Sequence, residues 1–217
     1  MRQQFNTPEI FIKFFNDSHE TIEKLKLYEI ELKRWQPVVN LVAPSTINRI
    51  WHRHFADSAQ IAEFIPQKTF HLADIGSGGG FPGLVLAIVL HYRSDFRVTL
   101  VESDGRKAAF LREITRKIEI PVEIISTRIE SNVTISKLGG VDFVTARALA
   151  PLNRLLSLVF PFFSDKTRGF FLKGKDVYRE IEFASRSWKF KFDLQKSRTL
   201  SEGRIVILRN LTRRPEV

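Results

Sequence analysis

One stretch of the sequence, Leu72 to Gly83, constrains the fold more than any other. It is an apolar run that breaks into a glycine-rich loop and then continues into a second apolar run. Five of the chain's 11 glycines lie between Gly76 and Gly83. Glycine is used where the backbone turns through positive φ or passes close to a ligand, because a side chain would collide there. The stretch therefore predicts a strand, a loop that holds a nucleotide-like cofactor, and a helix.

This loop matches two cofactor-binding patterns. Gly78 to Gly83 fits the G-x-G-x-x-G fingerprint of dinucleotide-binding enzymes, and Glu102 stands where that fingerprint has its ribose-binding acid. Asp74-x-Gly76-x-Gly78-x-Gly80 instead resembles the first motif of class I S-adenosylmethionine methyltransferases. In that motif Asp74 would order the loop or contact an ammonium group, the glycines would pack against the methionine part of the cofactor, and Glu102 would bind both ribose hydroxyls. A glycine turn with a purely structural role is the third interpretation.

The periodicity of apolar residues divides the chain into two parts. Residues 1–65 have apolar positions at three- and four-residue spacing, which predicts three amphipathic helices packed on the remainder, the third over about 47–65. Residues 66–217 alternate short apolar runs with amphipathic segments, which predicts parallel strands joined by crossover helices. The expected strands are 71–76, 96–102, 122–127, 141–147, 169–174, 189–197 and 203–209. The expected helices between and after them are 83–92, 105–118, 129–138, 151–163 and 176–187.

The last two expected strands differ from the others because only a Ser201-Glu202-Gly203 turn separates them. They are therefore expected to form an antiparallel hairpin. This ending differs from the two mirrored halves of a dinucleotide dehydrogenase. We expect an α/β, Rossmann-like methyltransferase domain over 66–217, with a seven-stranded, mostly parallel sheet, and an N-terminal helical segment over 1–65.

The charge balance is unusual for a globular chain. A net charge of +10 and an isoelectric point near 10.0 indicate a polyanionic partner such as nucleic acid, or a membrane surface. No uncharged apolar run reaches the roughly 18 residues of a membrane-spanning helix, so we expect a cytoplasmic protein without a membrane partner. Because the chain has no cysteine, disulfides, thiolate metal sites and a covalent thiol mechanism are excluded. We expect no bound metal.

Further motifs stand in one order along the chain: Tyr28-x6-Trp35-x4-Asn40-Leu41, Arg53-His54-x2-Asp57-Ser58, the glycine loop, Arg147-Ala148 and Leu172-Lys173-Gly174. In these blocks the sequence resembles the bacterial small-subunit ribosomal RNA guanine-N7 methyltransferases, the glucose-inhibited division protein B family, from about Tyr28 to the last strand. It departs from the family pattern at five positions, Gln36, Val42, Gly79, Phe81 and Glu102. The changes at Gly79, Phe81 and Glu102 keep the backbone contacts of the loop and an acidic residue. Those at Gln36 and Val42 weaken the match in the helical segment.

The resemblance implies a cofactor and its contacts. Family members bind S-adenosylmethionine at the positions that match Gly76, Phe81, the Ile129-Glu130 pair and Arg147. Ile129 and Glu130 follow the third expected strand, where an apolar side chain can face an adenine ring. For Glu130 a solvated helix start is the alternative. Together with Asp74, Gly78 and Glu102 of the loop motif, these residues form the expected cofactor site.

Two cations, Arg147 and Lys173, stand at the carboxyl ends of the fourth and fifth expected strands, the edge at which open α/β sheets bind ligands. Arg147 is suited to grip a cofactor carboxylate or an RNA phosphate bidentately, with a surface salt bridge as the alternative. Lys173 is expected near the target nucleotide, or is a solvated lysine. We treat both as positioning groups. His54 is expected to be a packing histidine, with a catalytic base as the alternative, whereas Arg53 is a candidate for binding RNA or anchoring a loop.

Two basic clusters are candidates for contacts with RNA phosphates. The first lies on the second crossover helix and comprises Arg106, Lys107, Arg112, Arg116 and Lys117. The second surrounds the fifth strand and comprises Lys166, Arg168, Lys173, Lys175 and Arg179. A solvated helix face is the alternative for the first cluster. The second is favoured because it surrounds a strand end where the site is expected.

The sequence also lacks the catalytic devices of other nucleic-acid methyltransferases. It has no cysteine to attack carbon 5 of a pyrimidine, and residues 145–149 do not form the Asn/Asp-Pro-Pro-aromatic motif used on adenine amino groups. Guanine N7 needs neither device, because its in-plane lone pair carries no proton and orientation suffices.

The resemblance thus implies methyl transfer from S-adenosylmethionine to N7 of a guanine in 16S rRNA, guanine 527 in the family. The substrate would be 16S rRNA, the small ribosomal subunit or an assembly intermediate. An NAD(P)-dependent oxidoreductase, and a catalytically inactive RNA-binding protein on a methyltransferase fold, remain the alternatives.

Overall fold

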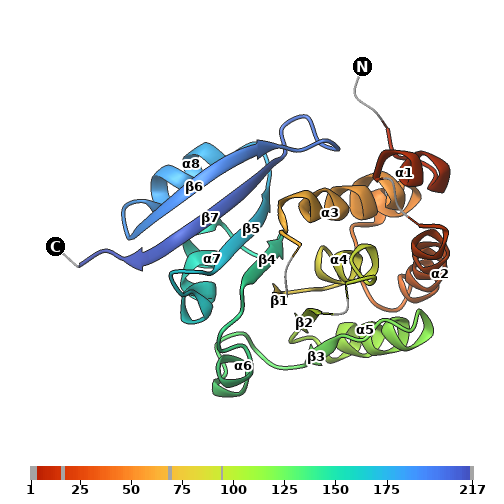
Figure 1. The fold of residues 1–217 in the computed structure, drawn as a ribbon, viewed down its shortest axis with the longest axis horizontal. Coiled ribbons are helices and arrows are strands. Elements are labelled where there is room, and N and C mark those ends of the chain that lie inside the picture. The colour runs from red at the N-terminus through yellow and green to blue at the C-terminus, as the bar shows by residue number, and fades with distance from the viewer. Residues whose placement is uncertain (1–3, 16–17, 68–69, 94, 216–217) are drawn as a thin grey trace.

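A single seven-stranded sheet organises the computed structural model, which describes residues 4–15, 18–67, 70–93 and 95–215. The strands are β1 (Phe70–Ile75), β2 (Phe96–Val101), β3 (Glu123–Ile125), β4 (Phe143–Arg147), β5 (Arg168–Lys173), β6 (Trp188–Lys196) and β7 (Arg204–Arg213). Their order in the sheet is β3-β2-β1-β4-β5-β7-β6. The first five strands run parallel, and β7 runs antiparallel to both β5 and β6 (Figure 1). The predicted mostly parallel sheet with a C-terminal hairpin is therefore confirmed.

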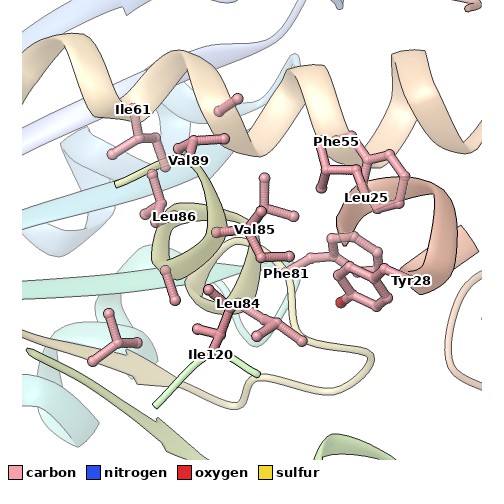
Figure 2. Close-up of a cluster of buried hydrophobic side chains, with 14 of the residues drawn as sticks. Leu25, Tyr28, Phe55, Ile61, Phe81, Leu84, Val85, Leu86, Val89 and Ile120 are labelled. Atoms are coloured by element: carbon pink, nitrogen blue, oxygen red, sulfur yellow. The ribbon is translucent and has the colours of Figure 1, made fainter. Parts of the chain in front are cut away.

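Helices cover both faces of this sheet. On one face α4 (Gly83–Val89) and α5 (Gly105–Lys117) pack against the sheet, and α2 (His19–Trp35) packs outside them with α1 (Pro8–Phe15) beside it. The other packs mainly against α7 (Leu152–Val159) and α8 (Val177–Ala184), with α6 (Asn132–Lys137) at its margin. The first hydrophobic cluster joins Phe11, Leu25 and Phe55 of the N-terminal segment to Leu84 and Phe110. Figure 2 shows Leu25, Phe55 and Leu84 of this cluster. The N-terminal helices and the α/β part of the chain therefore share one core.

The third expected N-terminal helix is not regular. It consists of a 3-10 turn (Pro44–Arg49), a π-helical turn (Trp51–Ala56), a short α3 (Asp57–Ala59) and a second 3-10 turn (Gln60–Phe64). The wide π turn presents the Arg53 carbonyl and the His54 ring to Arg147, which donates a hydrogen bond to each. Such π turns occur frequently at functional sites. The prediction of one continuous α-helix, which rested on apolar spacing alone, was therefore wrong.

The remaining elements match the expected ones with shifted ends. α7 ends at Val159 and a 3-10 turn, Phe160–Phe162, follows it. Pro161 has no N–H for a helical hydrogen bond. The hairpin connection spans residues 197–203 rather than only Ser201 to Gly203. It is longer because Ser197 and Thr199 are buried and bond to the N-terminal segment.

Candidate functional site

A cleft of about 940 Å³ opens at the carboxyl ends of the parallel strands. It is lined by the glycine loop after β1, by Glu102 after β2, by residues 147–151 after β4, and by Lys173 and Gly174 after β5. The π turn and the 197–203 loop supply another wall. β1 and β4 are neighbours in the middle of the parallel strands, with β2 beside β1 and β5 beside β4. The strands after β1 are added on one side and those after β4 on the other, so the strand order reverses between β1 and β4. Open α/β sheets bind ligands at this switch point.

The glycine loop is held in a conformation that only glycine adopts easily. Gly76, Gly78 and Gly80 have φ values of +70°, +56° and +93°. The Gly78 N–H donates to Glu102 Oε2 at 2.8 Å, and the Asp104 N–H donates to Glu102 Oε1 at 2.7 Å. Glu102 therefore fixes the loop to the end of β2 while its carboxylate faces the cleft.

Asp74 lies beneath the loop. It is not among the described residues that line the cleft. Its carboxyl group is fully buried and accepts a hydrogen bond from the Thr145 hydroxyl at 2.7 Å. A Cβ atom at Gly83 would overlap the Asp74 side chain, so α4 starts directly against this carboxyl group. Burial raises the pKa of Asp74 to about 6. Of the two roles expected for Asp74, the structure supports ordering of the loop.

The N-terminal segment supports the loop from the side opposite the sheet. The Tyr28 hydroxyl, on α2, donates to the Gly79 carbonyl oxygen. The rings of Tyr28 and Phe81 stack with centroids 5.4 Å apart and an interplanar angle of 8° (Figure 2). Burial raises the pKa of the Tyr28 hydroxyl well above its usual value, so this group remains a donor. Tyr28 was part of the family motif but was not expected at the site.

Arg147 reaches across the cleft to the π turn. Its Nη1 donates to the Arg53 carbonyl at 3.1 Å and lies 3.6 Å from Asp57 Oδ2. The guanidinium also lies over the Phe81 ring, 4.8 Å from its centroid. Burial lowers the pKa of Arg147, and the buried Asp57 carboxylate opposes this shift. Arg147 is thus held in the cleft wall by an internal ion pair rather than by the alternative surface salt bridge.

His54 is a fully satisfied packing histidine, as predicted. Arg147 Nη2 donates to His54 Nδ1 at 2.7 Å, so Nε2 carries the proton and donates to the Thr46 hydroxyl at 2.8 Å. Burial, with Arg147 and Arg53 nearby, lowers the pKa of His54 to about 3. The ring is therefore neutral at neutral pH and both its nitrogens are engaged.

Lys173 is not a free cation. Its Nζ donates to the Ala150 carbonyl and to Glu180 Oε2, each at 2.7 Å, and its side chain is 8% exposed. The same Glu180 oxygen accepts the Leu152 N–H at 2.6 Å. Lys173 thus fixes the β4–α7 connection, which forms part of the cleft wall, to the end of β5.

The expected site residues fall into two groups. Those that line the cleft are Arg53, Gly76, Gly78, Phe81, Glu102, Lys107, Ile129, Arg147 and Lys173. The side chains of Arg106, Glu130 and Lys175 are exposed and lie outside the lining formed by the described residues. In the second basic cluster, Lys166 and Arg168 lie at the amino end of β5, away from the cleft, because that strand begins at Arg168.

Several cleft residues were missed by sequence reasoning. They are Asp57 and, from the hairpin loop and β7, Ser197, Leu200, Gly203 and Arg204. Asp57 stands in the Arg53-His54-x2-Asp57 motif, which was a usable signal. The hairpin residues gave no such signal in the sequence, because Ser, Leu and Gly are common near turns.

Within residues 4–15, 18–67, 70–93 and 95–215, no three His, Asp or Glu side chains are grouped so that they could hold a metal ion. No helix in the same ranges is both long and apolar enough to cross a membrane.

Comparisons with known proteins agree with this architecture. A family model described as rRNA small subunit methyltransferase G matches residues 21–207. The chain is 41% identical over 203 residues to a Ribosomal RNA small subunit methyltransferase G of Parvibaculum lavamentivorans, covering 94% of this chain and 89% of that protein. It is 47% identical over 189 residues to the protein of the same name from Methylobacterium radiotolerans, covering 87% and 88%.

The fold can also be compared with solved structures. Aeropyrum pernix fibrillarin, in complex with natively bound S-adenosyl-L-methionine, superposes with a TM-score of 0.55 at 13% identity. The match covers 71% of this chain and 76% of that chain. With the sheet order, these findings confirm the class I S-adenosylmethionine-dependent methyltransferase fold predicted from the sequence.

Proposed function

The chain belongs to the rRNA small subunit methyltransferase G family, and on this premise we propose that it transfers a methyl group from S-adenosylmethionine to N7 of a guanine in 16S rRNA. Family membership makes it an rRNA methyltransferase; the base, the atom and guanine 527 are the proposed part. The observation that carries the proposal is the cleft in which the glycine loop, Glu102 and Arg147 meet.

The cleft has a donor set that fits the cofactor. S-adenosylmethionine supplies an electrophilic methyl group on a sulfonium sulfur. Each Glu102 oxygen already accepts one backbone N–H and keeps a second lone pair for a ribose hydroxyl. Gly76 has φ +70°, and a Cβ atom there would lie 2.6 Å from Leu149 Cδ1, so the residue without a side chain suits this part of the cleft lining. Ile129 and the backbone of the exposed Glu130 would lie beside the adenine ring.

Arg147 is proposed to bind the carboxylate of the methionine part. A cation beside a sulfonium would be repulsive by itself, but Asp57 lies 3.6 Å from Arg147 and offsets its charge. The Phe81 ring lies under the guanidinium, 4.8 Å from Arg147 Cζ, and helps to hold it in place. Asp74 supports this site from beneath the loop and does not touch the cofactor in this proposal.

The acceptor atom is inferred from what the cleft side chains can do. His54 is neutral and has both nitrogens engaged, and the Lys173 ammonium is bound to Glu180. These groups are therefore poorly placed to remove a proton from a substrate. Guanine N7 requires no deprotonation, so orientation and exclusion of water are sufficient. Arg147 and Lys173 act as positioning residues in this scheme.

The RNA substrate is supported by charge. Arg53 and Lys107 line the cleft in a chain of net charge +10, and RNA phosphates bind such cations with steep salt dependence. We propose that Arg106 and Lys175, exposed next to the cleft residues Lys107 and Gly174, contact RNA outside it. The guanine must be unstacked to reach the methyl group.

The direct test uses small ribosomal subunits from a strain that lacks the family enzyme. These subunits, and protein-free 16S rRNA, are incubated with the protein and labelled S-adenosylmethionine. Borohydride and aniline treatment then cleaves RNA at 7-methylguanosine, and primer extension locates the break. We expect label in 16S rRNA and one aniline-sensitive site at guanine 527. Label without such a site would disprove N7 methylation.

The alternatives are separated by calorimetry with S-adenosylhomocysteine and with NADH. We expect binding of S-adenosylhomocysteine that Glu102→Ala weakens, and no binding of NADH. Tight NADH binding without a response to S-adenosylhomocysteine would favour the oxidoreductase. RNA binding without any transfer of label would favour a catalytically inactive RNA-binding protein.

A further inference from the structure

Three cations stand side by side across the last three strands of the sheet. Lys173 on β5 is the register partner of Arg204 on β7, and Arg204 is the register partner of Lys196 on β6. Register partners on neighbouring strands point to the same face of the sheet, so the three side chains form one row. Like charges directly opposite each other destabilise a sheet. A carboxylate or a bound anion beside such a row therefore stabilises it.

Only one cation of the row is compensated internally. Lys173 forms an ion pair with Glu180 at 2.7 Å. Lys196 is exposed, and neither it nor Arg204 has an ion pair with a carboxylate among the described residues. Arg204 Nη1 donates to the Gly203 carbonyl at 2.8 Å, which orients the guanidinium without neutralising it. Two adjacent positive charges are therefore left for an anionic partner.

This pair lies on the rim of the candidate site. Arg204 lines the cleft together with Gly203 and Leu200, and Lys196 is its neighbour on the outermost strand, at the edge of the sheet. Lys196 is the last residue of β6, at the end of the strand that meets the 197–203 loop of the cleft wall (Figure 1). A polyanion that lies along this rim of the cleft therefore meets both cations.

The hairpin that carries the pair is held firmly at its loop. The Thr199 hydroxyl donates to Asp57 Oδ1 at 2.5 Å, and His52 Nε2 bonds to the Thr199 carbonyl at 2.9 Å. The Arg198 N–H donates to Gln60 Oε1 at 3.0 Å. These bonds fix the residues between Lys196 and Arg204 to the N-terminal segment. The backbone that carries the two cations is thus preorganised, which reduces the entropic cost of binding.

We propose that Lys196 and Arg204 together bind the phosphate backbone of the substrate RNA where it leaves the cleft. This inference rests on the proposed function and adds a docking surface for the RNA on the C-terminal hairpin. An arginine offers a phosphate two parallel N–H donors, and a lysine adds a point charge beside it. The contact reads no base, so it fixes the orientation of the RNA rather than its sequence.

The test measures binding of a 16S rRNA transcript on filters as salt is raised from about 50 to about 200 mM. The variants are Lys196→Gln, Arg204→Gln and the double variant. The matched controls are Lys189→Gln, an exposed lysine at the other end of β6, and Arg168→Gln, an exposed arginine at the amino end of β5. Each rim substitution is expected to weaken binding roughly fivefold and to make the salt slope shallower by about 0.7 for each phosphate that the variant no longer neutralises. The controls are expected to change binding by less than roughly twofold.

Three readouts make the outcome decisive. Melting curves of Lys196→Gln are expected to show equal or higher stability, because the like-charge contact is removed, and Arg204→Lys is expected to recover part of the affinity. Equal losses in the rim variants and the controls would overturn the inference and leave the methylation proposal intact. Weaker binding to small subunits with unchanged binding to the transcript would assign the rim to an acidic protein instead, and would also overturn it. If the wild-type protein binds the transcript through the rim but methylates no RNA, the proposed function fails instead.

Discussion

At the scale of single residues, one α-carbon sets how closely α2 approaches the glycine loop. Gly80 has φ +93°, and a Cβ atom there would overlap the Tyr28 hydroxyl oxygen and lie 3.0 Å from Leu84 Cβ. The same hydroxyl donates to Gly79. The missing side chain therefore allows the hydrogen bond that joins the N-terminal segment to the cofactor loop.

Gly80→Ala tests this contact. We expect the substitution to lower the free energy of unfolding by about 2 to 5 kcal/mol, because positive φ and steric overlap both oppose the methyl group. Gly140→Ala is the matched control, since Gly140 has φ +83° but no atom within 4 Å of the added Cβ. It should cost only about 1 to 2 kcal/mol. Equal costs in urea unfolding would contradict a role for Tyr28.

His54 gives a second expectation at this scale, for pH dependence. Its pKa is about 3 in the folded protein, against 6.5 for the free side chain. Between these values only the unfolded chain binds the proton, so the stability from the neutral ring is complete above pH 6.5 and is lost as pH falls toward 3. The slope reaches about 1.4 kcal/mol per pH unit.

The measurement compares urea unfolding of the wild-type protein and His54→Asn near neutral pH and again about one unit below pH 6.5. The wild-type protein should lose about 1 kcal/mol more than the variant between the two conditions. Asp74 titrates in both proteins, and its contribution cancels in the comparison. Equal losses of unfolding free energy in the two proteins would show that His54 is protonated in the folded protein at the lower pH.

At the scale of elements, the strands β1, β2, β4 and β5 could be predicted because each contains a short buried run bounded by turn residues. The runs around Ala73 and Val144 illustrate this, and parallel strands place all their carboxyl ends at one edge, so Glu102, Arg147 and Lys173 could be assigned to one site. The π turn could not be predicted, because it depends on Arg147, which lies 94 residues after Arg53. Local apolar spacing contains no information about such a distant hydrogen bond.

The docking of the 197–203 loop is the other element that the sequence did not predict, and Asp57→Asn tests it. Asp57 is 4% exposed and accepts hydrogen bonds from Thr199, Ser197 and Gln60. Its loss leaves Arg147 without a countercharge, so we expect a decrease of about 2 to 4 kcal/mol in unfolding free energy and faster tryptic cleavage after Arg198.

Glu63→Gln is the control for that substitution. Glu63 pairs with Arg198 on the same loop, but both side chains are about two-fifths exposed. An exposed pair of this kind contributes about 0 to 1 kcal/mol. Cleavage that is as fast in Glu63→Gln as in Asp57→Asn would mean that the surface pair, rather than the buried carboxylate, holds the loop.

At the scale of the whole molecule, the expected boundary at residue 65 separates two sequence patterns that meet in one core. Phe11, Trp51 and Phe55 belong to the same hydrophobic cluster as Leu84 and Phe110. A second cluster, which contains Trp188, covers the other face of the sheet. We propose that the helical segment over 1–65 and the Rossmann-like domain over 66–217 unfold as one cooperative unit.

Tryptophan fluorescence can test cooperativity on both faces. Replacing two of the three tryptophans by phenylalanine leaves Trp51 or Trp188 as the single probe, each about 95% buried. In urea each fluorescence transition should coincide with the far-UV circular dichroism transition of the same variant. A Trp51 signal that changes at lower urea would indicate that the N-terminal segment unfolds separately.

The bond between Asp57 and Thr199 spans 142 residues of sequence. During synthesis the carboxylate emerges long before the hydroxyl that will bind it, and the wall of the cleft stays open for that whole interval. Until then the growing chain contains the glycine loop, β1 to β5 and Arg147 but not the Ser197 to Arg204 wall. Among the walls of the cleft, the one that contains Arg204 is therefore the last to be synthesised.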